Sequence, residues 1–185
     1  MSAPRYSLSS ILLHWAMALA ILLAWGGMQL AEALQRGPTK VLVVGSHALL
    51  GLGVLALLLP RILARLLGRR PAPPDGAPDW EHRLAAATHL LLYALMLALP
   101  LSGIVTAMTG RVPFELPGLG AIPNLLATSG LRRTVKEVHE LLANGLLAVV
   151  AMHVAATLFH AFIRRDDVAA RMMPWLARGD ARPMG

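Results

Sequence analysis

Four apolar runs in the sequence are each long enough to cross the hydrocarbon core of a lipid bilayer. A helix needs about 20 residues to span that core, and in lipid it satisfies its own backbone hydrogen bonds. The runs extend over Ile11 to Ala31, Val41 to Pro60, Leu84 to Met108 and Leu141 to Ile163. The sequence therefore predicts an all-α fold, an integral membrane four-helix bundle, in a single domain of residues 1–185 with spans at roughly 9–33, 40–67, 83–108 and 135–163.

The composition agrees with a membrane protein. Hydrophobic residues make up 56% of the chain, charged residues make up 15%, and the mean hydropathy is +0.60. These values exclude an ordinary soluble domain. The first apolar run is too long for the core of a signal peptide, contains His14, and is followed by no small-residue cleavage site. We therefore expect it to be a permanent helix.

Two longer connections interrupt the predicted helices. The segment from Arg69 to Asp79 contains PAPPDGAPD, which cannot continue a helix. The segment from Thr109 to Gly130 contains several prolines and glycines that break any regular helix. We expect the leucines of this second segment to rest in the membrane interface.

The distribution of charge predicts the orientation. The net charge is +7 and the pI is near 11.2, but the basic residues lie between apolar runs, so we expect no nucleic-acid partner. With four spans, both termini and the middle connection share one side, which holds most of the 17 Lys and Arg residues, including Arg61 and Arg65. The positive-inside rule places that side in the cytoplasm. The alternative explanation is that one side holds more basic residues only because its loops are longer.

Histidine is the obvious metal ligand of this chain, because the sequence has seven histidines and no cysteine. The lack of cysteine excludes disulfides, thiolate zinc sites, iron–sulfur clusters and thioether-attached haem. A polar ring in hydrocarbon is costly and usually has a partner or a task. From the alternating direction of the spans, we expect His14 and His89 at cytoplasmic depth and His47 at external depth.

The last span carries a stripe of three histidines. His139 lies at its outer end, His153 follows 14 residues later, and His160 follows seven residues after that. Fourteen helical residues advance by about 21 Å and return to within roughly 40° of the starting direction, and seven more return to within about 20°. His139 and His153 therefore share one face at opposite depths.

Matching the depths predicts two histidine pairs, His47 with His139 near the outside and His14 with His153 towards the cytoplasm. Two imidazoles that face each other across a bundle suit the axial ligation of haem iron, which favours electron transfer over oxygen binding. We therefore expect these four histidines to hold two buried haems.

Other interpretations of these positions stay open. A single intramembrane histidine is about as often an interhelical hydrogen-bond partner as a metal ligand. A zinc site explains less, because the pairs lie at different depths and the chain has no cysteine. Gly51 and Ala18, one helical turn after His47 and His14, would let a flat porphyrin approach the backbone. Glycine is also common where bare helices pack in membranes.

Several segments resemble the bacterial cytochrome b561 family, and together they cover essentially the whole chain. They are YSLSSILLHWAMA, GSHALLG, THLLLYALMLALPLSG, and VHELLANGLLAVVAMHVAATLFHAF followed by RMMP. The resemblance implies a four-helix bundle in the bacterial inner membrane with two haem b groups. The ligand histidines of the family match His14, His47, His139 and His153.

The resemblance implies two kinds of redox activity. Some members are similar to superoxide oxidase, an oxidoreductase that takes electrons from superoxide outside and reduces ubiquinone in the membrane. Close relatives are cytochrome b subunits that connect a hydrogenase or another dehydrogenase to quinone. A non-redox membrane protein whose histidines line a cation path is the remaining alternative.

External basic residues favour superoxide as the donor. Arg132, Arg133 and Lys136 precede the fourth helix close to His139, and Arg111 lies in the same external segment. Such a cationic patch would attract a small anion. An ordinary row of arginines that anchors a helix end is the alternative.

The quinone is expected beside the cytoplasmic haem. His160 and His89 are the unassigned polar groups at that depth, and imidazole both donates and accepts hydrogen bonds. The resemblance favours His160 as the residue that contacts quinone, whereas His89 equally suits a hydrogen bond to a neighbouring group or a haem propionate. We expect His82 in a solvated loop beside Arg83. Trp15 would pack on the porphyrin or, more commonly, anchor the helix at the interface.

Overall fold

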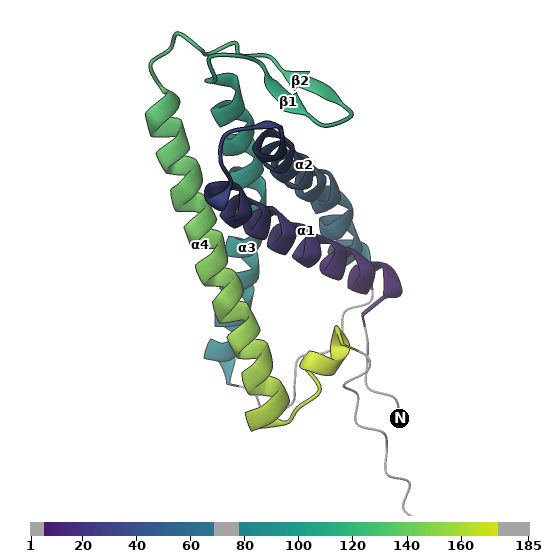
Figure 1. Cartoon of the computed structure of the whole chain (residues 1–185). Coiled ribbons are helices and arrows are strands. Elements are labelled where there is room, and N and C mark those ends of the chain that lie inside the picture. Colours follow the sequence, from purple (N-terminus) through teal and green to yellow (C-terminus); the bar gives the residue numbers. More distant parts are fainter. Residues whose placement is uncertain (1–5, 69–77, 174–185) are drawn as a thin grey trace, which may run out of the picture.

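The computed structural model describes residues 6–68 and 78–173. Its four long helices are α1 (Leu8–Ala33), α2 (Pro38–Leu67), α3 (Asp79–Met108) and α4 (Arg132–Phe159) (Figure 1). All four helices of this described part are long and apolar enough to cross a membrane. The predicted all-α four-helix membrane bundle is confirmed, and each helix begins slightly before the predicted span.

Local signals in the sequence explain where the first two helices begin. Ser7 caps α1, because its hydroxyl accepts a hydrogen bond of 3.3 Å from the backbone N–H of Ser10. Pro38 opens α2, where its missing N–H costs nothing and its fixed φ suits the first helical turn. The short connection from 34 to 37 makes α1 and α2 antiparallel neighbours.

The bundle packs as two antiparallel helix pairs. Helix α1 packs against α2, α3 packs against α4, and α2 joins the two pairs by packing against α3. Met17, Val54 and Leu58 form a buried hydrophobic cluster, with Tyr93 and Met96 of α3 packed against it. This cluster ties the pair α1–α2 to α3.

Most large apolar side chains point outward from the bundle. Leu90 and Leu141, for example, keep 72% and 71% of their surface exposed. Exposed apolar surface on this scale marks contact with a non-aqueous medium. The helices therefore bury little of their surface against one another, and their outer faces suit the lipid tails of a bilayer.

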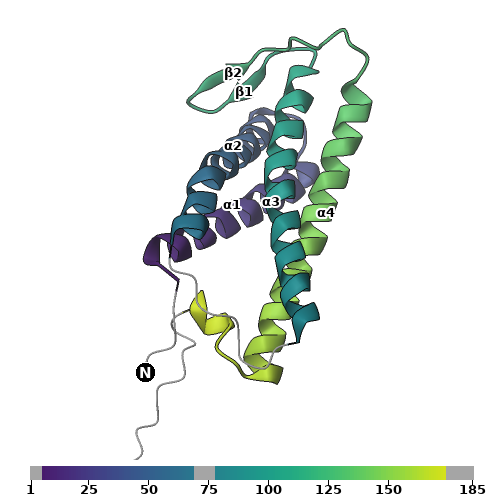
Figure 2. The same cartoon turned by 180° about the vertical axis from the view of Figure 1, so that it is seen from behind.

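A short β-hairpin covers one end of the bundle. Strands β1 (Phe114–Leu116) and β2 (Gly120–Ile122) pair antiparallel in the connection between α3 and α4 (Figures 1 and 2). Gly118 and Gly120 have φ of 76° and 96°, a region that favours glycine. The sequence analysis correctly expected no helix in this connection but did not anticipate the hairpin. We call this the hairpin end of the bundle.

Gly45 lets the hairpin approach α2. A Cβ atom at this position would lie 2.6 Å from the Cδ of Pro117 and 3.0 Å from the carbonyl oxygen of Glu115. Any larger side chain would therefore displace the hairpin from the start of α2, two residues before His47.

The opposite end, which we call the tail end, is closed by the segment that follows α4. A π-helical turn (His160–Arg164) extends α4, and a short 3-10 helix (Ala169–Arg171) follows. Trp15 donates a hydrogen bond of 3.0 Å from its indole Nε1 to the carbonyl oxygen of Met172. The segment therefore returns to the start of α1, as the second view of the bundle shows (Figure 2).

The structure corrects one placement made from the sequence, because His82 lies near the start of α3 and not in a loop. Arg61 and Arg65 lie in α2, as the predicted span 40–67 implies, and Arg61 is buried. Residues 69–77 of the predicted proline-rich connection lie outside the described residues.

Candidate functional site: two facing histidine pairs

One pair of facing histidines lies towards the hairpin end. His47, near the start of α2, and His139, near the start of α4, have ring centres 6.2 Å apart and ring planes at 84°. The pair therefore joins the two antiparallel halves of the bundle, α1–α2 and α3–α4. We call it the hairpin-end pair.

Each ring of this pair is oriented by a helix other than its own. The Nδ1 of His47 lies 2.9 Å from the carbonyl oxygen of Ala24 on α1. The Nδ1 of His139 lies 2.9 Å from the hydroxyl oxygen of Ser102 on α3, and that hydroxyl donates to the carbonyl oxygen of Leu99 at 2.7 Å. Both Nδ1 atoms therefore act as N–H donors, which leaves Nε2 as the lone-pair nitrogen of each neutral ring.

The His139 ring packs against Gly103 of α3. A Cβ atom at Gly103 would lie 3.1 Å from the Cε1 atom of His139. A side chain at Gly103 would therefore press the ring away by a few tenths of an ångström from the position at which Ser102 reaches its Nδ1 atom. The SG pair of the third span therefore has a packing role in this site.

The second pair lies towards the tail end. His14 of α1 and His153 of α4 have ring centres 6.2 Å apart and ring planes at 69°. His89 of α3 lies beside the same site, with its ring centre 5.5 Å from that of His153. The Nδ1 of His89 is 2.6 Å from the carbonyl oxygen of Ala85, one turn earlier in α3. The tail-end pair, His14 and His153, thus has a third imidazole as neighbour.

Arg61 brings a buried positive charge to the tail-end pair, a feature that the sequence analysis missed. Its Nη1 donates a hydrogen bond to the carbonyl oxygen of Ser10, and only 7% of the residue is exposed. That carbonyl lies one helical turn before His14 in α1, so the guanidinium lies near the tail-end pair. The sequence did contain a sign of this buried charge. Arg61 directly follows Pro60, and apolar residues continue after it in α2.

The separation within both pairs fits a metal held between two imidazoles. A metal about 2 Å from each nitrogen, with each ring centre roughly 1 Å farther back, puts the two centres about 6 Å apart. Both pairs measure 6.2 Å. Among the described residues, no group of three or more His, Cys, Asp or Glu side chains gathers around a common point. Two-ligand sites of this kind suit haem iron, for which the porphyrin supplies the other four ligands.

The basic residues at the start of α4 form ion pairs, which reduce the cationic patch expected from the sequence. Arg133 binds Glu137 at 2.7 Å, and Lys136 binds Glu140. Both pairs have i,i+4 spacing, a signal that was present in the sequence. Arg132 instead donates a hydrogen bond of 3.3 Å from its Nη1 to the carbonyl oxygen of Thr109, at the end of α3. The structure therefore brings these residues together near His139 with part of their charge balanced.

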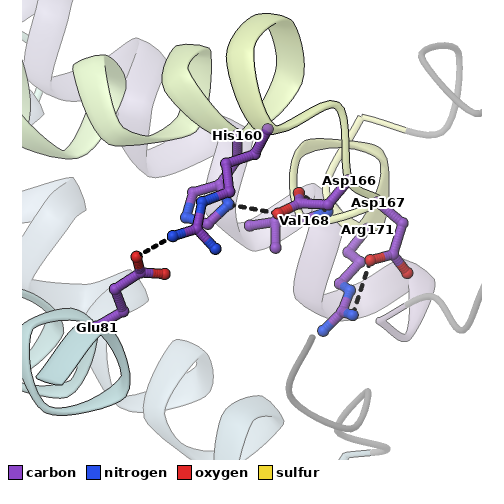
Figure 3. A network of polar contacts seen from close by, with 7 residues as sticks. Glu81, His160, Asp166, Asp167, Val168 and Arg171 are labelled. Atoms are coloured by element: carbon purple, nitrogen blue, oxygen red, sulfur yellow. Dashed lines mark hydrogen bonds and ion pairs between the residues drawn. The ribbon is translucent and has the colours of Figure 1, made fainter. Parts of the chain in front are cut away.

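His160 lies in a polar network at the tail end. Its Nδ1 is 2.6 Å from the Oδ2 of Asp166, and Figure 3 shows the two side chains pointing toward each other. Arg164 binds Glu81 of α3, and Arg171 binds Asp167 at 2.9 Å. The sequence analysis did not predict that Asp166 binds His160. The contact depends on the turn after α4, which helix periodicity does not reveal.

Comparison with known proteins covers nearly the whole chain. Residues 5–175 match a family model described as prokaryotic cytochrome b561. The chain is 30% identical over 171 residues to cytochrome b561 homolog 1 of Escherichia coli strain K12, with 92% of this chain and 97% of that protein covered. It is 31% identical over 174 residues to a probable superoxide oxidase of Yersinia pestis, with 92% and 96% covered. It is 31% identical over 176 residues to a cytochrome b562 of Cereibacter sphaeroides, with 92% and 96% covered.

Proposed function

Because this chain belongs to the prokaryotic cytochrome b561 family, whose members are membrane cytochromes b that transfer electrons, we propose that it carries electrons from an external one-electron donor to ubiquinone. The observation that carries the proposal is the equal separation of 6.2 Å within two histidine pairs at different depths. Two centres at different depths form a path for electrons across part of the bilayer. The bacterial inner membrane is the proposed location, with the tail end and both termini in the cytoplasm.

Four histidines would hold two haem b groups in this proposal. His47 and His139 would bind the outer haem, and His14 and His153 the inner one. When bound, haem iron would supply one-electron redox chemistry at these histidines, and a histidine from each of two helices would favour electron transfer over oxygen binding. The helix carbonyl at Ala24 and the hydroxyl of Ser102 hold the hairpin-end rings in place. Arg61, which is bound at Ser10 one turn before His14, would place a positive charge near the inner haem.

Superoxide is the proposed donor. The similarity to a probable superoxide oxidase supports this choice, and so does the position of Arg132 and Arg133 at the start of α4, the helix that carries His139. The charge of Arg133 is balanced by Glu137, so Arg132 would contribute more to the attraction of a small anion. Two superoxide anions, one ubiquinone and two protons would give two molecules of oxygen and one ubiquinol.

Ubiquinone is the proposed acceptor at the tail end. His160 is the first residue of the π-helical turn that extends α4, two turns beyond His153 and at the edge of the membrane-spanning segment. Its ring belongs to the polar network of the tail end. Protons from the cytoplasmic water would reach the ring through this network. A quinone oxygen beside His160 would therefore receive electrons from the membrane interior and a proton from the protein.

A protein donor is the second candidate. The paired charges Arg133–Glu137 and Lys136–Glu140 make this outer surface mixed in sign, and mixed charge suits a complementary protein surface. In that case the chain would be the cytochrome b subunit that links a hydrogenase or another dehydrogenase to quinone.

Two measurements test the proposal. The protein purified from haem-replete cells is expected to show low-spin b-type bands with about two haems per chain. A colourless preparation would rule out the redox function. Mixing the oxidised protein with a superoxide source is then expected to reduce the haem bands promptly, whereas unchanged bands would favour a protein donor.

A further inference from the structure

A carboxylate–imidazole pair, His160 with Asp166, stands at the end of α4. We infer that Asp166 is a positioning residue for quinone reduction, which holds the His160 ring in the orientation in which it protonates the quinone oxygen. This inference rests on the proposed function and names a residue that the proposed function does not require.

The backbone after α4 is shaped to return Asp166 to the His160 ring. The helix widens into a π-turn over His160–Arg164, and Arg165 follows in the left-handed region with φ of 56° and ψ of 35°. The backbone N–H of Asp166 then donates to the carbonyl oxygen of His160 at 3.2 Å. A π-turn and a left-handed residue are ordinary ways for a helix to end, and here they turn the chain so that Asp166 lies against the His160 ring.

The carboxylate of Asp166 is fixed at both oxygens. Its Oδ2 lies 2.6 Å from the Nδ1 of His160, and its Oδ1 accepts a hydrogen bond of 3.1 Å from the backbone N–H of Val168. The two side chains keep only 21% and 23% of their surface exposed. Because Asp166 is held by the backbone, it determines the orientation of the imidazole, and not the reverse.

The neighbouring charges have other partners. Arg164 binds Glu81, and Arg171 binds Asp167 (Figure 3). Glu81 and Asp167 thus each bind an arginine, whereas Asp166 binds the imidazole of His160. This pairing makes Asp167 a matched control, because it is the next residue, carries the same carboxylate, and binds an arginine instead of His160.

The arrangement assigns separate roles to the two ring nitrogens. With Asp166 as a carboxylate, Nδ1 keeps its proton as a donor, so proton exchange takes place at Nε2. During quinone reduction the N–H bond at Nε2 would break and an O–H bond would form on the quinone oxygen that has accepted electrons. The ring would return to its neutral form, with Nδ1–H still bound to Asp166, and Nε2 would then take a proton from water.

The kinetic test separates electron entry from quinone reduction. The haems of the purified protein are reduced with dithionite under anaerobic conditions, and their reoxidation by ubiquinone-1 is followed optically. We expect Asp166→Asn to slow reoxidation by about tenfold to a hundredfold, with unchanged haem content and unchanged KM for the quinone. Asp166→Glu should recover part of the rate, and Asp167→Asn should match the wild type. Equal rates for Asp166→Asn and Asp167→Asn would overturn the inference.

A double variant and a spectroscopic measurement show whether Asp166 acts through His160. In a His160→Gln background, Asp166→Asn should cause no further loss, because the ring that it positions is gone. In ¹⁵N-histidine spectra of the oxidised protein, the His160 signal should show a protonated Nδ1, and this signature should disappear in Asp166→Asn. Additive losses, or an unchanged His160 signal, would contradict the inference. A wild-type protein that ubiquinone-1 fails to reoxidise would instead refute the proposed function.

Discussion

The rings of His47 and His139 face each other with 6.2 Å between their centres, and each is hydrogen-bonded to a further helix of the bundle. His47 on α2 reaches Ala24 of α1, and His139 on α4 reaches Ser102 of α3. All four helices therefore contribute to one site. A ligand position built in this way depends on the assembled bundle, and changes at any of these contacts should alter it.

Replacement of single histidines should remove one haem at a time. His47→Ala or His139→Ala should remove mainly the outer haem, and His14→Ala or His153→Ala mainly the inner one, because each pair joins different helices. Haem content and the reduced optical spectrum of the purified variants measure this. His82→Ala, near the start of α3, is the control and should keep both haems. Equal loss of both haems in all four variants would contradict the assignment of the pairs.

Removal of the Ser102 hydroxyl should weaken the outer haem without abolishing it. Ser102 orients the His139 ring by accepting from its Nδ1, and the loss of such a supporting contact typically costs about 10–100-fold in metal affinity. Ser102→Ala should therefore lose its outer haem at a lower concentration of a competing haem-binding protein. Ser129→Ala, whose hydroxyl bonds only within the loop after the hairpin, is the control. Identical haem loss from both variants would show that Ser102 does not support the site.

A side chain at Gly45 should destabilise the hairpin end. The new methyl group of Gly45→Ala would lie 2.6 Å from the Cδ of Pro117, so the hairpin must move. We expect a loss of about 1–3 kcal/mol, measured as a lower Tm in detergent. Gly53→Ala in the same helix meets nothing within 4 Å and should leave stability unchanged or raise it by about 0.5–1 kcal/mol. A Tm for Gly45→Ala at or above that of Gly53→Ala would mean that the hairpin adapts freely.

Charge changes at the start of α4 should alter the reaction with superoxide in both directions. Glu137→Gln should speed haem reduction, because it releases the charge of Arg133 from its partner, and Arg132→Gln should slow it about twofold to fivefold. Both effects should shrink as ionic strength rises. Arg83→Gln, near the opposite end, is the control for charge alone. Stopped-flow rates that do not respond to Glu137→Gln would argue against electrostatic attraction at this surface.

Loss of the Arg61 charge should make the inner haem harder to reduce. The guanidinium of Arg61 is bound at Ser10, one turn before His14, and a positive charge near the site favours the form that holds the extra electron. Arg61→Gln should therefore lower the midpoint potential of the inner haem by on the order of tens of millivolts. Arg36→Gln, exposed after α1 at the hairpin end, should leave both potentials in place. If a redox titration shows a higher midpoint potential of the inner haem in Arg61→Gln, the charge of Arg61 does not favour reduction of that haem.

The four helices and the depth of each histidine could be read from the sequence, because both depend on local properties. The length of an apolar run fixes whether a helix spans the bilayer, and alternating span directions fix the end at which a residue lies. The spacing from His139 to His153 is a property of one helix. The expectation that His47 and His14 lie opposite these two residues followed from depth alone, and the structure brings both pairs to the same separation.

The sequence could not predict the contacts between residues that a turn or loop brings together. The approach of Pro117 to Gly45 needs the hairpin, the bond from His139 to Ser102 needs the packing of α4 on α3, and the return of Asp166 to His160 needs the left-handed turn at Arg165. Helix periodicity and hydropathy act over one helix and hold no information on which faces meet. The sequence by itself therefore determined the spans and the levels of the histidines. The tertiary structure decided which groups orient each ring, because those hydrogen bonds join residues on different helices and turns.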